Sequence, residues 1–171
     1  MKTTILIAAI AVLGLVGCTD AKKRHHGALH NQDSPVRQTT DKEKLAGAPI
    51  SPGKVTYLAD PDFRCLIMDY VAHPREWVYR GNRPAIIDFY ATWCGPCKMM
   101  TPIVDAMARA YAGKVDFYKV DIDKERQLAA TLGIQSIPTF LFVPASGNPT
   151  LLTGAMQRVE FEKAMRDILF K

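Results

Sequence analysis

The sequence is poor in cysteine and has no hydrophobic run long enough to cross a membrane. Only four of its 171 residues are cysteine, and the close pair Cys94 and Cys97 has no second CxxC or matching Cys/His pair. A structural zinc site needs about four ligands, so this pattern argues against zinc and against any other metal. The apolar run at residues 5–16 falls short of the roughly 20 residues that a membrane span requires.

Basic residues also lack the arrangement that nucleic-acid binding requires. The chain carries 22 Lys and Arg against 17 Asp and Glu, a formal charge of +5. Residues 54–171 contain no basic stripe with interleaved aromatics, so no nucleic-acid partner is expected. Much of the surplus lies in Lys22, Lys23 and Arg24, a cluster that can lie against anionic lipid headgroups. We find no internal repeat and no second domain.

The N-terminus has the pattern of a secreted protein. Lys2, the apolar run and a small residue, Gly17, predict a signal peptide over residues 1–17; the alternative is a buried N-terminal helix. Leu15-Val16-Gly17-Cys18 resembles the lipobox of bacterial lipoproteins. That resemblance implies that Cys18 is lipidated and anchors the protein to the periplasmic side of a membrane. Each buried CH₂ of the acyl chains would contribute about 0.8 kcal/mol. The choice between the inner and outer membrane stays open.

A polar segment follows, which we expect to be a flexible tether over residues 18–53. About 35 such residues have a root-mean-square span of roughly 30 Å. His25, His26 and His30 lie in it and could hold a metal, but a solvated linker is the preferred interpretation because no acidic or Cys partner is nearby.

Residues 54–171 alternate strand and helix signals, which predicts one α/β domain with a central sheet covered on both faces. Apolar runs predict strands, and apolar residues at helical spacing predict helices, the first opening at Asp60-Pro61 with Asp60 as its cap. A short turn-rich connection between the last two strands suggests that they are antiparallel. The expected strands are 55–58, 85–91, 115–120, 139–143 and 150–153, and the later helices are 97–111, 124–132 and 158–169.

Cys94 and Cys97 lie between a predicted strand and a predicted helix, which is typical of a redox-active pair. The attacking species in disulfide exchange is a thiolate, and a helix N-terminus favours negative charge. Cys94 is therefore the expected nucleophile. Cys97, expected to be more buried, would resolve the mixed disulfide. Gly95-Pro96 makes the turn between them compact.

Asp88 lies in the middle of an apolar strand, where an isolated carboxylate is costly and its pKa should be raised. Such a group could accept the proton of Cys97, although a purely structural carboxyl is the alternative. Lys119, in the next predicted strand, is the plausible cationic partner, unless it points to solvent. Proline is allowed at the first residue of a strand, as at Pro138.

Residues 55–171 resemble thioredoxins, and the matching motifs occur in the family's order and spacing. These are Asp88-Phe89-Tyr90-Ala91, Trp93-Cys94-Gly95-Pro96-Cys97-Lys98, Pro102, Lys119-Val120-Asp121, Gly133-Ile134, Ile137-Pro138-Thr139 and Gly154. The resemblance implies a thioredoxin fold, no cofactor beyond the Cys94–Cys97 disulfide, and a cis Pro138 against that pair. It implies that the backbone of Ile137 receives an extended substrate segment, within a docking surface formed by Trp93, Gly95, Pro96, Ile137, Pro138 and Gly154. It also implies that Asp88 accepts the Cys97 proton and that Lys119 tunes it.

Two features differ from an ordinary thioredoxin. Residues 73–83, with Trp77 and Tyr79, lengthen the connection before the active-site strand; we expect a packed loop, with an extra partner surface as the alternative. Cys65 lies beside Leu66 and Ile67 on the first predicted helix and is expected to be buried and inert, with a regulatory thiol as the alternative.

Taken together, the motifs predict an enzyme that reduces or isomerises protein disulfides outside the cytoplasm. Disulfides persist there, so a reductant needs recharging, and the resemblance implies a membrane protein as electron donor. The alternatives are net disulfide oxidation by the same pair and a non-catalytic binding or chaperone module.

Overall fold

A computed structural model describes residues 51–171, so the predicted signal peptide, Cys18 and nearly all of the predicted tether lie outside the described residues. All the strands and helices expected in this range are present, with ends that differ from prediction by at most two residues. The elements are β1 (Val55–Tyr57), α1 (Asp60–Leu66), β2 (Ala85–Tyr90), α2 (Gly95–Ala110), β3 (Asp116–Asp121), α3 (Arg126–Thr131), β4 (Thr139–Val143), β5 (Thr150–Thr153) and α4 (Arg158–Leu169).

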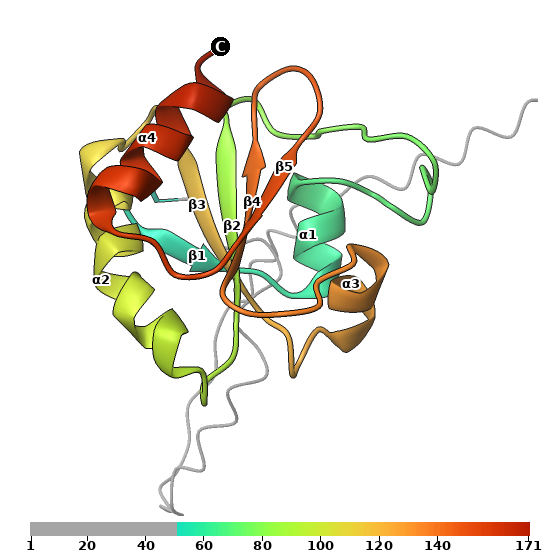
Figure 1. Ribbon diagram of the computed structural model, residues 1–171. Helices are drawn as coiled ribbons and strands as arrows, with labels where there is room; N and C mark the ends of the chain where they lie inside the picture. The colour runs from blue at the N-terminus through green and yellow to red at the C-terminus, as the bar shows by residue number, and fades with distance from the viewer. Residues whose placement is uncertain (1–50) are drawn as a thin grey trace, which may run out of the picture. The chain divides into compact units, whose positions relative to one another are not determined.

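The strands form one mixed sheet in the order β1-β3-β2-β4-β5 (Figure 1). β3 pairs in parallel with both β1 and β2, whereas β4 pairs antiparallel with β2 and with β5. The predicted antiparallel pair at the end of the chain and the mixed character of the sheet are therefore confirmed. β2, which leads into the CxxC motif, lies in the middle of the sheet and is buried along nearly its whole length.

Helices cover both faces of the sheet, as expected from the alternation of strands and helices. Ile87 of β2 belongs to a core with residues of α1 and α3, whereas its neighbour Ile86 belongs to a second core with residues of α2 and α4. Figure 1 shows the same division, with α2 and α4 on one side of the strands and α1 and α3 on the other. Successive side chains of a strand point to opposite faces, so Asp88, two residues after Ile86, points to the face that α2 covers.

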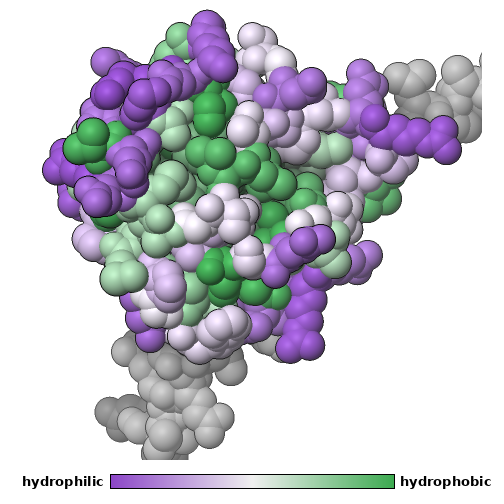
Figure 2. All heavy atoms as spheres, in the orientation of Figure 1, coloured by the Kyte–Doolittle hydropathy of each residue, from purple (hydrophilic) through white to green (hydrophobic). Residues whose placement is uncertain are grey.

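The outer surface is unevenly polar. Hydrophilic side chains gather over α4, whereas apolar side chains are visible over the middle of the same view, where β5 forms the edge of the sheet (Figure 2). Among residues 51–171, no helix has the length and apolar character that crossing a bilayer would require.

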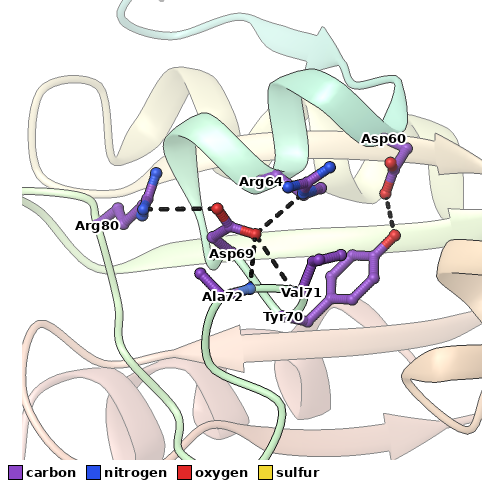
Figure 3. Close-up of polar contacts among 7 residues, drawn as sticks. All are labelled: Asp60, Arg64, Asp69, Tyr70, Val71, Ala72 and Arg80. Carbon is purple, nitrogen blue, oxygen red and sulfur yellow. Dashed lines mark hydrogen bonds and ion pairs between the residues drawn. The ribbon is translucent and has the colours of Figure 1, made fainter. Parts of the chain in front are cut away.

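The long connection between α1 and β2 is a packed loop, as expected. Trp77 and Tyr79 pack against the core on the α1 side, and burial raises the pKa of the Tyr79 hydroxyl. At the start of this connection Asp69 contacts Arg64 and Arg80 and accepts backbone hydrogen bonds (Figure 3). The loop is thus fixed to the domain both by apolar contacts and by hydrogen bonds.

Two predictions about α1 are wrong. Ala59, not Asp60, is the N-cap, because the Asp60 carboxylate accepts a hydrogen bond from the Tyr70 hydroxyl instead (Figure 3). Cys65 is exposed rather than buried. The buried side chains of α1 and its exit turn, Phe63 and Ile67, are four residues apart and share one face. Cys65 lies midway between them in the sequence and therefore points away from the core.

Candidate active site

Cys94 and Cys97 form a disulfide at the start of α2, with their Cα atoms 5.3 Å apart. Cys94 is the N-cap residue of the helix, with extended backbone, and Pro96 occupies its first turn, where a missing backbone N–H has no consequence. The Cys94 sulfur accepts a hydrogen bond from the Cys97 backbone N–H at 3.1 Å. The same N–H and the helix dipole would stabilise a thiolate on Cys94 once the disulfide opens.

The two cysteines are buried to almost the same extent, since Cys94 is 3% and Cys97 is 2% exposed. The expected greater burial of Cys97 is therefore too small to separate their roles in the disulfide form. Their places in the helix do separate them. Cys94 precedes the first turn and receives the backbone hydrogen bond, whereas Cys97 lies within the helix.

Asp88 and Lys119 form a buried ion pair on the face of the sheet that α2 covers. They lie opposite each other in the parallel register of β2 and β3, and Lys119 Nζ is 3.4 Å from Asp88 Oδ2. The Asp88 side chain is 0% exposed, and neither of its oxygens accepts a hydrogen bond from the described residues. Burial raises the pKa of Asp88 to about 6, and the Lys119 ammonium offsets part of this rise.

Lys119 has two further contacts that the sequence did not predict. Its ammonium donates to the Thr101 hydroxyl at 3.0 Å and lies 4.9 Å from the centre of the Tyr90 ring. The Thr101 hydroxyl in turn donates to the Cys97 carbonyl at 3.2 Å. Thr101 lies four residues after Cys97, about one helical turn, so its contact with Cys97 could have been predicted from the sequence spacing. Its contact with Lys119 depends on the packing of α2 against β3.

The segment before β4 lies against the disulfide. Ile137 packs on the small cluster of Ala91, Cys94 and Cys97, and the Ile137–Pro138 peptide bond is cis, as the resemblance implied. The Gly154 backbone N–H donates to the Pro138 carbonyl at 2.8 Å, and Gly154 has a φ of +105° that favours glycine. The structure therefore brings Ile137, Pro138 and Gly154 together beside the cysteine pair.

Trp93 is the most exposed aromatic residue near the disulfide, with 67% of its surface accessible. Its indole N–H donates to Asp123 Oδ2 at 2.8 Å, so the ring is held in place although it faces solvent. Asp123, in the turn after β3, was not predicted from the sequence. Gly95 and Pro96 are exposed next to Trp93, which leaves an apolar surface open around the buried sulfurs.

A mixed sheet with a CxxC disulfide at a helix start, a buried carboxylate on the sheet face that this helix covers and a cis proline beside the disulfide defines the class of thiol–disulfide oxidoreductases. A family profile described as Thioredoxin matches residues 72–167, which is more than half of the chain. The chain belongs to the thioredoxin family. It is an enzyme that exchanges protein thiols and disulfides through its own redox-active disulfide.

Individual relatives agree with this assignment. A thioredoxin of Borreliella burgdorferi is 47% identical over 110 residues, which cover 64% of this chain and 93% of that protein. Thioredoxin 1 of a Nostoc species is 37% identical over 91 residues, covering 53% of this chain and 85% of the relative. The chloroplast thioredoxin M4 of Arabidopsis thaliana is 37% identical over 97 residues, but this covers 55% of this chain and only half of that protein.

The fold also matches solved structures. The crystal structure of a chloroplastic thioredoxin z superimposes with a TM-score of 0.55 at 24% sequence identity. The match covers 67% of this chain and 94% of that chain. At this identity the match supports the fold, and the assignment of activity depends on the sequence relatives.

Proposed function

We propose that this chain reduces or isomerises disulfides of proteins outside the cytoplasm, with Cys94 as nucleophile. The Cys94 thiolate attacks one sulfur of the client disulfide, that S–S bond breaks, and the other client sulfur leaves as a thiolate. Cys97 then gives its proton to Asp88 and attacks the Cys94 sulfur. The mixed disulfide breaks and the second client thiolate leaves. The client gains two electrons, and the enzyme ends with the Cys94–Cys97 disulfide.

The observation that carries this assignment of roles is the Cys94 sulfur at the N-cap of α2, which accepts the Cys97 backbone N–H. A group in that position is stabilised as an anion. Asp88 supports the second step, because a carboxyl with a pKa of about 6 is ionised near neutral pH but still basic enough to take a proton. Lys119, the nearest cation, sets how basic Asp88 is.

The client is proposed to bind as an extended segment beside cis-Pro138. The backbone of Ile137 would pair with it as an added strand, and Trp93 would present its apolar ring. Gly95, Pro96 and Gly154 keep the surface flat around the sulfurs. The hydrogen bonds between Gly154 and Pro138 and between Trp93 and Asp123 fix this surface before a client arrives, which lowers the entropy lost on binding.

The location is supported by the sequence around Cys18. A lipobox-like segment and a polar stretch of about 35 residues suit a periplasmic lipoprotein whose domain works within roughly 30 Å of its membrane anchor. Replacing Cys18 with Ala should move the protein from the membrane fraction to the soluble fraction. Continued membrane association of this variant would contradict lipid anchoring at Cys18.

The reducing direction is supported by the Gly95-Pro96 dipeptide, which resembles that of reducing thioredoxins. A reductant outside the cytoplasm must be recharged, and we propose a membrane protein that delivers electrons from the cytoplasm. A measured reduction potential tests the direction. A reduction potential of about −270 mV, as in thioredoxin, supports a reductant. A potential of about −120 mV, as in a strong disulfide oxidant, would indicate net oxidation.

Trapping experiments test the exchange and identify the partners. In a Cys97→Ser variant the mixed disulfide on Cys94 cannot resolve, so clients stay attached. Recovery of secreted proteins together with a membrane electron donor supports the proposal, whereas recovery of an oxidase argues for the reverse direction. The matched control is the Cys94→Ser, Cys97→Ser double variant, which should trap nothing. Full cellular function of that double variant would instead indicate a binding or chaperone module.

A further inference from the structure

The hydroxyl of Thr101 lies between the Lys119 ammonium and the backbone carbonyl of Cys97. It donates its proton to the Cys97 carbonyl, a bond that threonine in a helix often makes with the residue four positions earlier. A hydroxyl has one proton, so the 3.0 Å contact with Lys119 must be one in which the ammonium donates. The hydrogen bonds therefore run in one direction, from Lys119 through Thr101 to the backbone of Cys97.

The contact with Thr101 is closer than the contact between Lys119 and Asp88. Lys119 Nζ is 3.0 Å from Thr101 Oγ1 but 3.4 Å from Asp88 Oδ2. A direct hydrogen bond between an ammonium and a carboxylate is about 2.7–2.9 Å long, so the ion pair is looser than it needs to be. The ammonium is directed to the hydroxyl although the carboxylate offers the stronger attraction.

We propose that Thr101 is a positioning residue of this oxidoreductase: its hydroxyl ties the Lys119 ammonium to the Cys97 backbone and holds it short of a direct hydrogen bond with Asp88. This proposal deepens the proposed function, since it rests on Asp88 as the proton acceptor of Cys97. A looser ion pair leaves the carboxylate less stabilised and therefore a better base.

Other charged and titratable groups around the pair do not replace Lys119. Lys119 also lines a cavity of about 210 Å³ together with Lys54, Tyr57, Thr101, Asp105 and Arg109, among others. Within residues 51–171, Lys119 is the only cation that forms an ion pair with Asp88. Tyr90 lies on the same face, and burial raises its pKa to about 12, so it stays neutral. Thr101 therefore acts on Asp88 through the distance between the Lys119 ammonium and the Asp88 carboxylate.

The test replaces Thr101 with Val, which has nearly the same shape but no hydroxyl. The titration of the Asp88 carboxyl is followed by carbon NMR in the disulfide form. We expect the inflection to fall by about one pH unit, a roughly tenfold loss of proton affinity, because Lys119 is free to close on Asp88. Thr101→Ser keeps the hydroxyl and should restore the wild-type inflection. Thr131→Val, the same change at an exposed position of α3, should have no effect.

Two further measurements keep the outcome clear. In a Lys119→Met background, Thr101→Val should no longer move the inflection, because its effect acts through the ammonium. If Thr101→Val does not fold, Thr101→Ala serves in its place. An unchanged or raised inflection in a folded variant overturns the proposal. The role of Asp88 is tested separately by the rate of the Cys97 step in Asp88→Asn, so its failure would be distinguishable from failure of the Thr101 proposal.

Discussion

Two aspartates of this domain lie beside basic side chains, Asp69 after α1 and Asp88 in β2. Asp69 Oδ1 accepts hydrogen bonds from Arg64 Nε at 3.0 Å and from the backbone N–H groups of Val71 and Ala72 at 3.3 Å each. Arg80 adds a second guanidinium at 3.7 Å (Figure 3). The hydrogen bond from Arg64 is the main reason why the pKa of Asp69 lies below its usual value.

Asp88 has the opposite surroundings. It is completely buried, and among the described residues Lys119, 3.4 Å away, is the one cation paired with it and no group donates a hydrogen bond to it. Burial therefore dominates and raises its pKa to about 6. Asp69 is arranged to stay charged and to hold a loop, whereas Asp88 is arranged to gain and lose a proton near neutral pH. The difference supports the proposed role of Asp88, and not of Asp69, in proton transfer.

The largest expected effect is on the rate of the Cys97 step in Asp88→Asn. An amide cannot accept the proton of Cys97, and loss of a general base lowers a rate by about 100-fold or more. In the wild type the rate should rise with pH through about 6, as Asp88 ionises. Rapid-mixing kinetics with a fluorescent disulfide peptide would measure both.

Asp69→Asn is the matched control for that experiment, because it makes the same chemical change at the other aspartate. Its rate and pH profile should equal those of the wild type. An equal loss of rate in both variants, or a rise through pH 6 that persists in Asp88→Asn, would remove the distinction between the two carboxylates.

The second effect is on the pH dependence of stability. A raised carboxyl pKa means that the folded state binds more protons than the unfolded state between pH 4 and 6, so stability falls as the pH rises through this range. Since the pKa goes from 3.8 to about 6, the contribution of Asp88 is on the order of 3 kcal/mol. Denaturant unfolding of the disulfide form should show this loss in the wild type but not in Asp88→Asn. Parallel curves for the two proteins would contradict it.

The sequence was sufficient to predict the role of a residue where that role follows from the strand or helix in which the residue lies. Asp88 is conspicuous in an apolar strand, and Cys94 and Cys97 follow it at the start of a helix, so the redox pair was predicted. The fold was predicted from the alternation of strands and helices and from the resemblance to thioredoxins. The partnership of Asp88 with Lys119 was also predicted, because Lys119 is a cation in the next predicted strand; the structure adds that the two residues lie in register on parallel strands.

Residues that act through tertiary contacts could not be predicted in the same way. Thr101 reaches Lys119 only because α2 packs on β3, and Asp123 meets Trp93 across 30 positions of sequence. Cys65 was placed wrongly because its neighbours Leu66 and Ile67 are apolar, although the face of a short helix is set by residues three or four apart.

The smallest expected effect is on the stability of the loop at Asp69. Two substitutions separate the contribution of the Asp69 charge from that of its hydrogen-bond acceptor. Asp69→Asn removes the charge but keeps an oxygen that can accept the N–H groups of Val71 and Ala72, whereas Asp69→Ala removes both. Because a lost acceptor leaves these groups without their partner, the melting temperature should fall more in the Ala variant than in the Asn variant.

The lowered pKa of Asp69 means that its stabilisation is present at neutral pH and is lost as the pH falls through that pKa. Thermal unfolding at pH 7 and pH 3 would measure this. An equal loss in the two variants would mean that the guanidinium groups, and not the turn, make Asp69 a structural residue.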